Sequence, residues 1–238
     1  LRAALEHDAD SLDAFWSEIQ ASGAPLIEPV EGDDSQRLVT FLWRGDPATE
    51  HVLLWSHFTV GDIRNNALTQ LPGTDIWYRT YQLRSDLRTT YALSLNNPLT
   101  TWKALGGDDA AYDRHWCEFW QPDPLNPQTY ALPHDPVRPL PYYEHPQSRL
   151  ELPHAPPQRY VAARPDLPQG TLTASSFRST FLGNARRVWI YTPPGYQPDG
   201  PAYPLALFTD GWFYHVVAPT ILDNLHAEGR IPGLVAVF

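Results

Sequence analysis

The loop Asp210-Gly211-Trp212 is the segment of the sequence that could take part in chemistry most directly. It follows the apolar run YPLALF, and Gly211, which lacks a Cβ, would let a ligand approach the backbone closely. Backbone N–H groups in such a loop can stabilise the oxyanion that develops during acyl transfer. We interpret Gly211 and Trp212 as oxyanion-hole contributors, with Asp210 and His215 as nearby substrate contacts. The simpler alternative is a tight strand-to-helix turn at Asp-Gly.

A catalytic nucleophile is not evident from the sequence. No serine stands in a G-x-S-x-G elbow, the motif that exposes a nucleophile. Ser175-Ser176 lies within an expected strand and is interpreted as a strand or surface pair. The adjacent carboxylates Asp33-Asp34 and Asp108-Asp109 favour a solvated surface or a helix N-terminus over acid and base catalysis.

The histidines and the single cysteine do not suggest a metal site. His134, His145 and His154 occupy separate points of a proline-rich stretch and would have to converge with supporting groups to hold a metal. Cys117, the only cysteine, excludes an internal disulfide and a cysteine-based zinc site. We therefore expect neither a metal site nor a cofactor.

The elements around the loop predict a layered sheet. TLTASSFRS and ARRVWIYT are typical of paired strands, YPLALFTD and GLVAVF of fully buried strands, and HVVAPTILDNLHAEGR of a helix that ends at Gly229. A strand, a helix and a second buried strand imply a right-handed parallel crossover. A hairpin before such a strand is how an α/β-hydrolase sheet opens, and the loop after the strand supplies an oxyanion N–H.

The first 120 residues have a different pattern. Leu12, Phe15, Trp16 and Ile19 recur at helical spacing and predict an amphipathic helix that ends at Ser22-Gly23. QRLVTFLWR, EHVLLWSHF, DIWYRTYQLR and TTYALSL then alternate with turn clusters of Gly, Pro, Asn and Asp. This cadence predicts an immunoglobulin-like antiparallel β-sandwich with a leading helix.

Proline marks the connection between these parts. Of the 25 prolines, 13 fall between Pro122 and Pro168, where few backbone N–H groups remain for a ladder. We predict a helix and sandwich over 1–120, an irregular linker over 121–169, and over 170–238 the beginning of an α/β-hydrolase domain. Leu132, Tyr142, Tyr143, Leu150 and Tyr160 would bury the linker against its neighbours.

Charge and hydropathy exclude several partners. Lys and Arg total 17 against 27 Asp and Glu, a formal charge of −10, so nucleic acid and anionic membranes are not expected partners. No run approaches the ~18 apolar residues of a membrane span, and the first residues do not resemble a signal peptide, so we expect a soluble protein. A single cysteine is compatible with a reducing cytoplasm, and the expected location is cytoplasmic.

The sequence is interpreted as a piece of a longer protein, because it lacks Met and ends in an apolar run. A truncated parallel sheet exposes strand edges, which would favour homo-oligomers or reliance on the missing C-terminal hydrolase portion.

Several segments together resemble one enzyme family. RRVWIYTPPGY, PLALFTDGWF and LHAEGRIPGLVAVF are similar to the opening of the hydrolase domain of enterochelin (ferric enterobactin) esterases, which are α/β-hydrolases of the esterase D type. FWSEIQASGAPLIEP, VTFLWRG, LPGTDIWYRTYQLRSDLRTTYAL and DPLNP resemble the N-terminal domain of that family and its interdomain segment, in the same order. The resemblance spans nearly the whole chain.

This resemblance implies a serine esterase that cleaves a ferric catecholate siderophore inside the cell, with iron only as part of the substrate. The family places its catalytic triad beyond the point matching Phe238, so the chain alone is expected to be inactive. Arg64, Arg79, Arg84 and Arg88 would offer cationic contacts to the anionic catecholate by charge and stacking, with Arg64 in the loop GDIRNN that is expected to overhang the active site. The alternative is that these arginines keep a sheet edge soluble.

Two other functions fit the same residues. Another esterase D type carboxylesterase, such as a feruloyl esterase, would share the loop around Gly211. A carbohydrate-binding sandwich would use exposed Trp and Tyr faces and would not need the TPPGY to FTDG segment.

Overall fold

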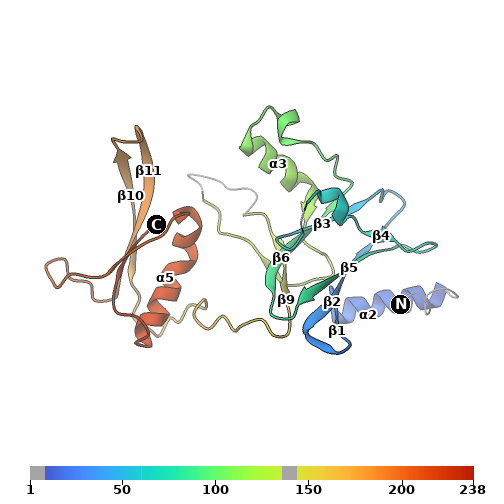
Figure 1. The fold of residues 1–238 in the computed structure, drawn as a ribbon, viewed down its shortest axis with the longest axis horizontal. Coiled ribbons are helices and arrows are strands. Elements are labelled where there is room, and N and C mark those ends of the chain that lie inside the picture. The colour runs from blue at the N-terminus through green and yellow to red at the C-terminus, as the bar shows by residue number, and fades with distance from the viewer. Residues whose placement is uncertain (1–8, 60, 136–143) are drawn as a thin grey trace. The chain divides into compact units, whose positions relative to one another are not determined.

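A computed structural model gives the fold and describes residues 9–59, 61–135 and 144–238. The chain forms two compact units, Leu1–Pro156 and Pro157–Phe238, here called the N-terminal and the C-terminal unit (Figure 1). Both consist mostly of sheet with few helices. Within the described ranges, no helix is both long enough and apolar enough to cross a membrane.

The N-terminal unit is built from two antiparallel sheets, with strand orders β1-β2-β5-β4 and β3-β6-β9-β8, the second also pairing β7 with β6. The first sheet comprises β1 (Leu26–Val30), β2 (Asp33–Arg44), β4 (Thr69–Gln70) and β5 (Ile76–Arg84). The second comprises β3 (Val52–Ser56), β6 (Arg88–Leu95), β7 (Trp120–Gln121), β8 (Thr129–Tyr130) and β9 (Gln147–Glu151). The four strands predicted between residues 36 and 95 are confirmed as β2, β3, β5 and β6.

The two sheets share one hydrophobic core. Val39 and Phe41 of β2 pack in the same buried cluster as Leu54 of β3 and Leu93 of β6. Because side chains alternate between the faces of a strand, Leu42 points to the opposite face, where it is also fully buried. The first sheet is therefore covered on both faces, which explains the unbroken apolar run at the centre of β2.

Helix α2 (Ala9–Ser22) covers the outer face of the first sheet. Its Trp16 and Ile19, each 2% exposed, cluster with Leu42 and Ile76. Gly23 follows with a φ of 84°, a left-handed conformation that glycine adopts without strain. The predicted amphipathic helix is confirmed. The other helical elements of this unit are η1 (Ile63–Asn66), η2 (Trp102–Leu105) and α3 (Asp109–Phe119).

The structure departs from the irregular linker expected over residues 121–169. Strand β9 lies inside this segment and pairs with β6 over the whole of Arg88–Tyr91, so it is a ladder strand of the second sheet. It falls in the proline-free interval between Pro146 and Pro153, where every residue keeps its N–H. Leu132 and Leu150 are buried as expected, Tyr160 is half-buried, and Tyr142 and Tyr143 lie outside the described residues.

A buried polar network fixes the turn that contains the DPLNP motif. The Tyr91 hydroxyl donates to Asp123 Oδ2 at 2.8 Å and accepts from Asn126 Nδ2 at 3.1 Å. Asp123 is 1% exposed, and burial raises the pKa of its carboxyl. Desolvation also raises the pKa of Tyr91, so its hydroxyl stays protonated as the donor. The DPLNP motif therefore has a structural role, because its Asp123 and Asn126 hold the turn to Tyr91.

The C-terminal unit is a four-stranded sheet with one long helix. Its strands are β10 (Thr171–Ser179), β11 (Asn184–Thr192), β12 (Leu205–Leu207) and β13 (Val235–Val237), in the order β10-β11-β13-β12, and its helix is α5 (Gly211–Ala227). β10 and β11 form an antiparallel hairpin, and β12 pairs with β13 in parallel. The predicted hairpin and strand-helix-strand order are confirmed.

The prediction that β12 is fully buried is wrong. Leu205 and Leu207 are 70% and 75% exposed, whereas Ala206 packs against the core formed with α5. The strand is at the edge of the sheet, and α5 covers the face that Ala206 shares. Its apolar run would suit a strand covered on both faces, but in this structure only one face is packed.

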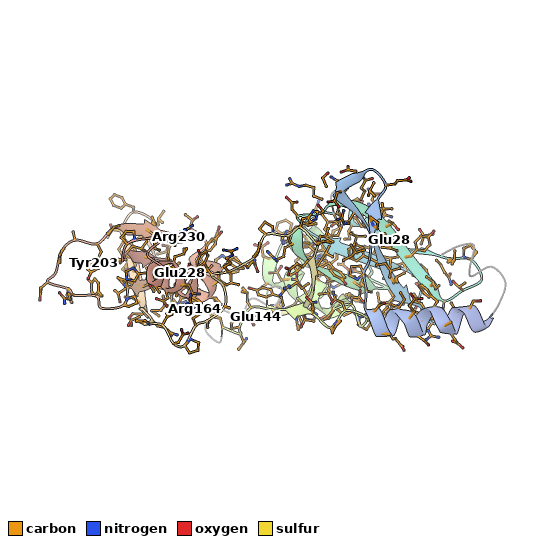
Figure 2. The ribbon with its side chains drawn as sticks, turned by 90° about the horizontal axis from the view of Figure 1, so that it is seen from below. Glu28, Glu144, Arg164, Tyr203, Glu228 and Arg230 are labelled. Atoms are coloured by element: carbon orange, nitrogen blue, oxygen red, sulfur yellow. The ribbon has the colours of Figure 1, made fainter. Side chains whose placement is uncertain are left out.

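The stretch that enters the C-terminal unit is tied to α5. Asn224, 2% exposed, donates to the carbonyls of Tyr160 and Ala162 at 2.8 and 2.9 Å. Asp223 accepts from the Tyr191 hydroxyl at 2.7 Å and from the Gly170 N–H at 2.8 Å. At the surface, Arg164 Nη1 lies 3.0 Å from Glu228 Oε1, and both side chains are labelled in Figure 2.

Candidate functional site

The predicted loop connects β12 to the start of α5. Phe208 still donates its N–H to the Val237 carbonyl at 2.8 Å, so the chain leaves the sheet only at Thr209. Asp210 is the N-cap residue and adopts a left-handed conformation with φ 55°, yet its side chain makes no capping hydrogen bond. Its carbonyl accepts from the N–H groups of Phe213 and Tyr214 at 2.9 and 3.3 Å.

Gly211 is required by packing at this position. A Cβ on Gly211 would lie 2.2 Å from the carbonyl carbon of Phe238, which follows β13. The first turn of α5 therefore lies directly against the end of that strand. The N–H groups of Gly211 and Trp212 belong to this first turn, where a helix offers them no acceptor of its own and carries partial positive charge. Such a helix start can stabilise an anionic oxygen.

His215 is held by two contacts. Its Nδ1 donates to the Gly211 carbonyl at 2.9 Å. Its ring stacks on Trp189 of β11, with ring centroids 3.9 Å apart and planes 14° from parallel. Arg187 lies over the same indole at 4.5 Å. The His215 side chain thus joins the start of α5 to β11, which gives it a structural role independent of any substrate.

Arg64 lies in the N-terminal unit, in η1, whereas the other four predicted site residues come together at the start of α5. Its side chain is 71% exposed and forms a forked ion pair with Asp62, the N-cap residue of η1. These contacts lower the pKa of Asp62 to about 2. An anionic ligand would have to compete with this local carboxylate for the guanidinium.

The other three arginines also have protein acceptors. Arg79 donates to the Tyr81 hydroxyl and the Ala67 carbonyl, each at 2.9 Å. Arg84 pairs with Asp86 at 2.6 Å, and Arg88 bridges Glu151 and the Pro156 carbonyl at 2.7 Å. As for Arg64, an anionic ligand would have to compete with these local acceptors.

The residues judged non-catalytic lie in structural contacts. Asp108 caps α3, with its carboxylate accepting from the Ala111 N–H at 3.0 Å, and Ser175 and Ser176 are exposed on β10. Asp33 and Asp34, expected in a loop, instead open β2. His134 contacts Glu144, and His145 contacts the Trp120 carbonyl.

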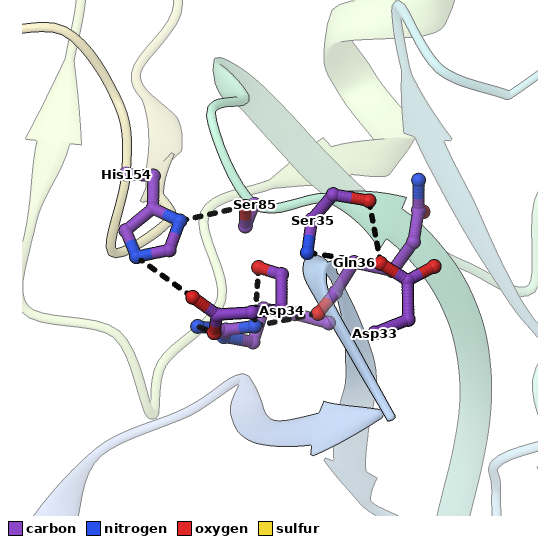
Figure 3. Close-up of polar contacts among 7 residues, drawn as sticks. Asp33, Asp34, Ser35, Gln36, Ser85 and His154 are labelled. Atoms are coloured by element: carbon purple, nitrogen blue, oxygen red, sulfur yellow. Dashed lines mark hydrogen bonds and ion pairs between the residues drawn. The ribbon is translucent and has the colours of Figure 1, made fainter. Parts of the chain in front are cut away.

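A serine, a histidine and an aspartate meet in the N-terminal unit, which the sequence did not indicate. The Ser85 hydroxyl lies 2.9 Å from His154 Nδ1, and His154 Nε2 lies 3.7 Å from Asp34 Oδ2 (Figure 3). The second distance exceeds a hydrogen bond. Asp34 is 79% exposed and pairs with Arg37, while Ser85 is 3% exposed. Because His154 also donates its backbone N–H to the Ser85 carbonyl, the group ties the chain after β9 to the β5–β6 turn.

An aromatic pocket of about 360 Å³ is the further feature that sequence reasoning missed. It lies where α3 and η1 meet the end of β3, and Figure 1 shows α3 on the side of the unit that carries β3. Tyr112 and Trp116 face it from successive turns of α3, a helical spacing that could have revealed it. Its lining consists of Trp55, Thr59, Gly61, Ile63, Asn66, Tyr112, Asp113, Trp116 and Trp120.

Known proteins resemble this chain over nearly all of its length. The family model described as "Enterochelin esterase, N-terminal" matches residues 38–161. The iron(III) enterobactin esterase of Yersinia enterocolitica is 30% identical over 250 aligned residues, which cover 94% of this chain and 67% of the relative.

Solved structures agree with this similarity. The ferric enterobactin esterase of Salmonella typhimurium matches with a TM-score of 0.62 and 25% identity, covering 94% of this chain and 57% of that one. The enterobactin esterase of Shigella flexneri, solved in the presence of 2,3-dihydroxy-N-benzoylserine, matches with a TM-score of 0.54 and 26% identity over 94% and 56%. The chain thus spans between 56% and 67% of the length of these relatives.

These relatives are carboxylic ester hydrolases. The fold of the C-terminal unit and the loop around Gly211 suggest the same class of enzyme. The match to the family model covers more than half of the sequence. The chain belongs to the enterochelin esterase family.

Proposed function

We propose that this chain is part of a serine esterase that hydrolyses the ester bonds of a ferric catecholate siderophore and releases its iron, which enters only as part of the substrate. The observation that carries the proposal is the parallel pair β12 and β13 joined by α5, with Gly211 packed at the end of β13. The enterobactin and dihydroxybenzoyl compounds in the names of the relatives support the substrate class.

The role proposed for this chain in the reaction is to stabilise charge. A serine hydroxyl would attack the ester carbonyl while a histidine takes its proton, and the oxyanion that forms would accept hydrogen bonds from the Gly211 and Trp212 N–H groups. The alcohol leaves with a proton from the histidine, and water then hydrolyses the acyl-enzyme. In this proposal the triad belongs to chain beyond Phe238, Asp210 and His215 border the substrate, and Arg64 attracts its anionic part.

The proposed fold is an immunoglobulin-like sandwich followed by the first part of an α/β-hydrolase domain. Two antiparallel sheets around one core support the sandwich. The exposed Leu205 and Leu207 support a further layer on the face opposite α5, and the position of β12 at the edge of its sheet supports a parallel sheet that continues beyond it. In this proposal residues 170–238 open the hydrolase domain, and residues 121–169 connect it to residues 1–120 while contributing β8 and β9.

Hydrolysis by the full-length protein tests the proposal. We expect it to cleave a ferric trimeric catecholate lactone with a kcat/KM well above that for a feruloyl ester, and to act in the cytoplasmic fraction. Residues 1–238 alone should give no burst of p-nitrophenol from an activated ester. A burst that one serine substitution within this chain abolishes would contradict the assignment of the nucleophile, and a preference for feruloyl esters would contradict the substrate.

A further inference from the structure

The aromatic pocket between α3, η1 and β3 is shaped by rings that brace one another. The Trp55 and Trp120 ring centroids lie 4.7 Å apart with planes tilted by 43°, and Trp116 meets Trp120 edge-on at 5.0 Å. Tyr112 extends the row, edge-on to Trp116 at 5.7 Å. Rings fixed in this way form a rigid wall of faces and edges, against which another flat ring can stack or pack edge-on.

Few polar groups of the pocket remain for a ligand. The Thr59 hydroxyl donates to the Ser56 carbonyl and accepts from the Ser56 N–H. Asn66 is 5% exposed, and its side-chain oxygen accepts from the Tyr81 hydroxyl at 2.9 Å. Asp113 differs, because among the described residues its carboxylate has neither a hydrogen-bond donor nor a cationic partner. The pocket thus offers aromatic surface, one carboxylate and, in its lining, the buried indole N–H of Trp116, which has no acceptor among the described residues.

The environment of Asp113 makes it a strong acceptor that repels anions. Burial, with a smaller contribution from Asp109, raises the pKa of its carboxyl. A carboxylate with greater proton affinity accepts a stronger hydrogen bond from a neutral hydroxyl. The same charge opposes the entry of a negatively charged group into a partly desolvated site.

We propose that this pocket binds one iron-free 2,3-dihydroxyphenyl ring, which packs against the Trp55, Trp116 and Trp120 wall and donates its adjacent hydroxyls to Asp113. The inference rests on the proposed function and adds a binding site in the N-terminal unit for the product, or for siderophore that carries no iron. Metal-bound catecholates have lost both hydroxyl protons, so the ferric complex cannot make this contact.

The small number of polar groups in the pocket disfavours a sugar, another kind of ligand that stacks on tryptophan. A hexose would bring several hydroxyls into a pocket whose threonine and asparagine already have partners, and each hydroxyl left without a partner costs about 1–3 kcal/mol. A dihydroxyphenyl ring has two hydroxyls on one edge, and the two oxygens of Asp113 can accept both.

Calorimetric titration of the 238-residue chain with 2,3-dihydroxybenzamide tests the inference. We expect saturable binding to one site, and binding of benzamide, which lacks the hydroxyls, at least about tenfold weaker. Asp113→Asn should weaken binding of the dihydroxy compound by about tenfold, and Ile63→Trp, which fills the pocket, should abolish it. Glu118→Gln, an exposed change on the same helix, is the matched control and should leave the affinity unchanged.

The outcomes separate this inference from the proposed function. Equal affinity of the wild-type chain and a folded Asp113→Asn variant, or tight binding of methyl glucoside in place of the dihydroxy compound, would overturn the pocket assignment whatever the activity of the full-length protein. Preferential binding of the ferric tris-catecholate would overturn it too. Failure of the full-length protein to hydrolyse the siderophore would instead overturn the proposed function.

Discussion

At the scale of single residues, the packing of Gly211 also fixes the place of the backbone N–H group that we propose as an oxyanion donor. The absence of its side chain is explained by the Phe238 carbonyl, which a Cβ would approach to 2.2 Å. The same close contact holds the first turn of α5 in the place where its N–H groups would meet an oxyanion. The interpretation of Asp210-Gly211 as a tight turn and its interpretation as part of an oxyanion hole are therefore compatible.

Gly211→Ala should consequently destabilise the C-terminal unit. Overpacking against backbone costs about 1–3 kcal/mol, because a carbonyl carbon cannot move aside as a side chain can. Gly233→Ala is the matched control, since a Cβ there would meet its nearest atoms at 3.5 Å, an ordinary contact. Urea unfolding of both variants measures the difference. If the two unfold at the same denaturant concentration, α5 does not pack against β13 as described.

At the scale of elements, charged groups fasten β9 to β6 at the edge of the core. Glu151 of β9 accepts from Arg88 of β6 at 2.7 Å and also pairs with Arg149, and these contacts lower its pKa from 4.5 to about 2. A carboxyl with a depressed pKa stabilises the folded state above its unfolded pKa, and this contribution is lost as the pH falls toward the folded value.

Glu151→Gln should therefore lower the free energy of unfolding at pH 7 by about 0.5–1 kcal/mol, a modest amount because the side chain is partly exposed. The difference from the wild type should shrink between pH 4.5 and about 2, where the wild-type carboxyl becomes protonated. Glu28→Gln, at an exposed site on β1, should show no such trend. Denaturant titrations across this pH range decide it, and a constant difference would exclude the ion pairs as its source.

The elements also show what the sequence could and could not predict. Periodicity was enough for α2, β2, β5 and the α5 crossover, because each carries its own apolar pattern. Strand β9 is short and flanked by prolines, so its place in a sheet depends on β6, far away in the sequence. The meeting of Trp55 with Trp120 and of Ser85 with His154 likewise depends on tertiary contacts, which spacing along the chain does not encode.

At the scale of the whole molecule, the exposed leucines of the C-terminal sheet should govern how the chain behaves in solution. Leu205 and Leu207 are 70% and 75% exposed, and they lie on β12, the last strand in the order of its sheet. Apolar edge strands recruit further strands, so this chain should self-associate as its concentration rises. Leu205→Lys places a charge on that edge and should shift the chain toward monomer, whereas Val161→Lys, also at an exposed apolar residue but outside the sheet, should not. Light scattering after size-exclusion chromatography measures the change. A chain that stays monomeric at high concentration without the lysine would argue that this edge needs no further strand, and would weaken the proposal that the sheet continues beyond β12.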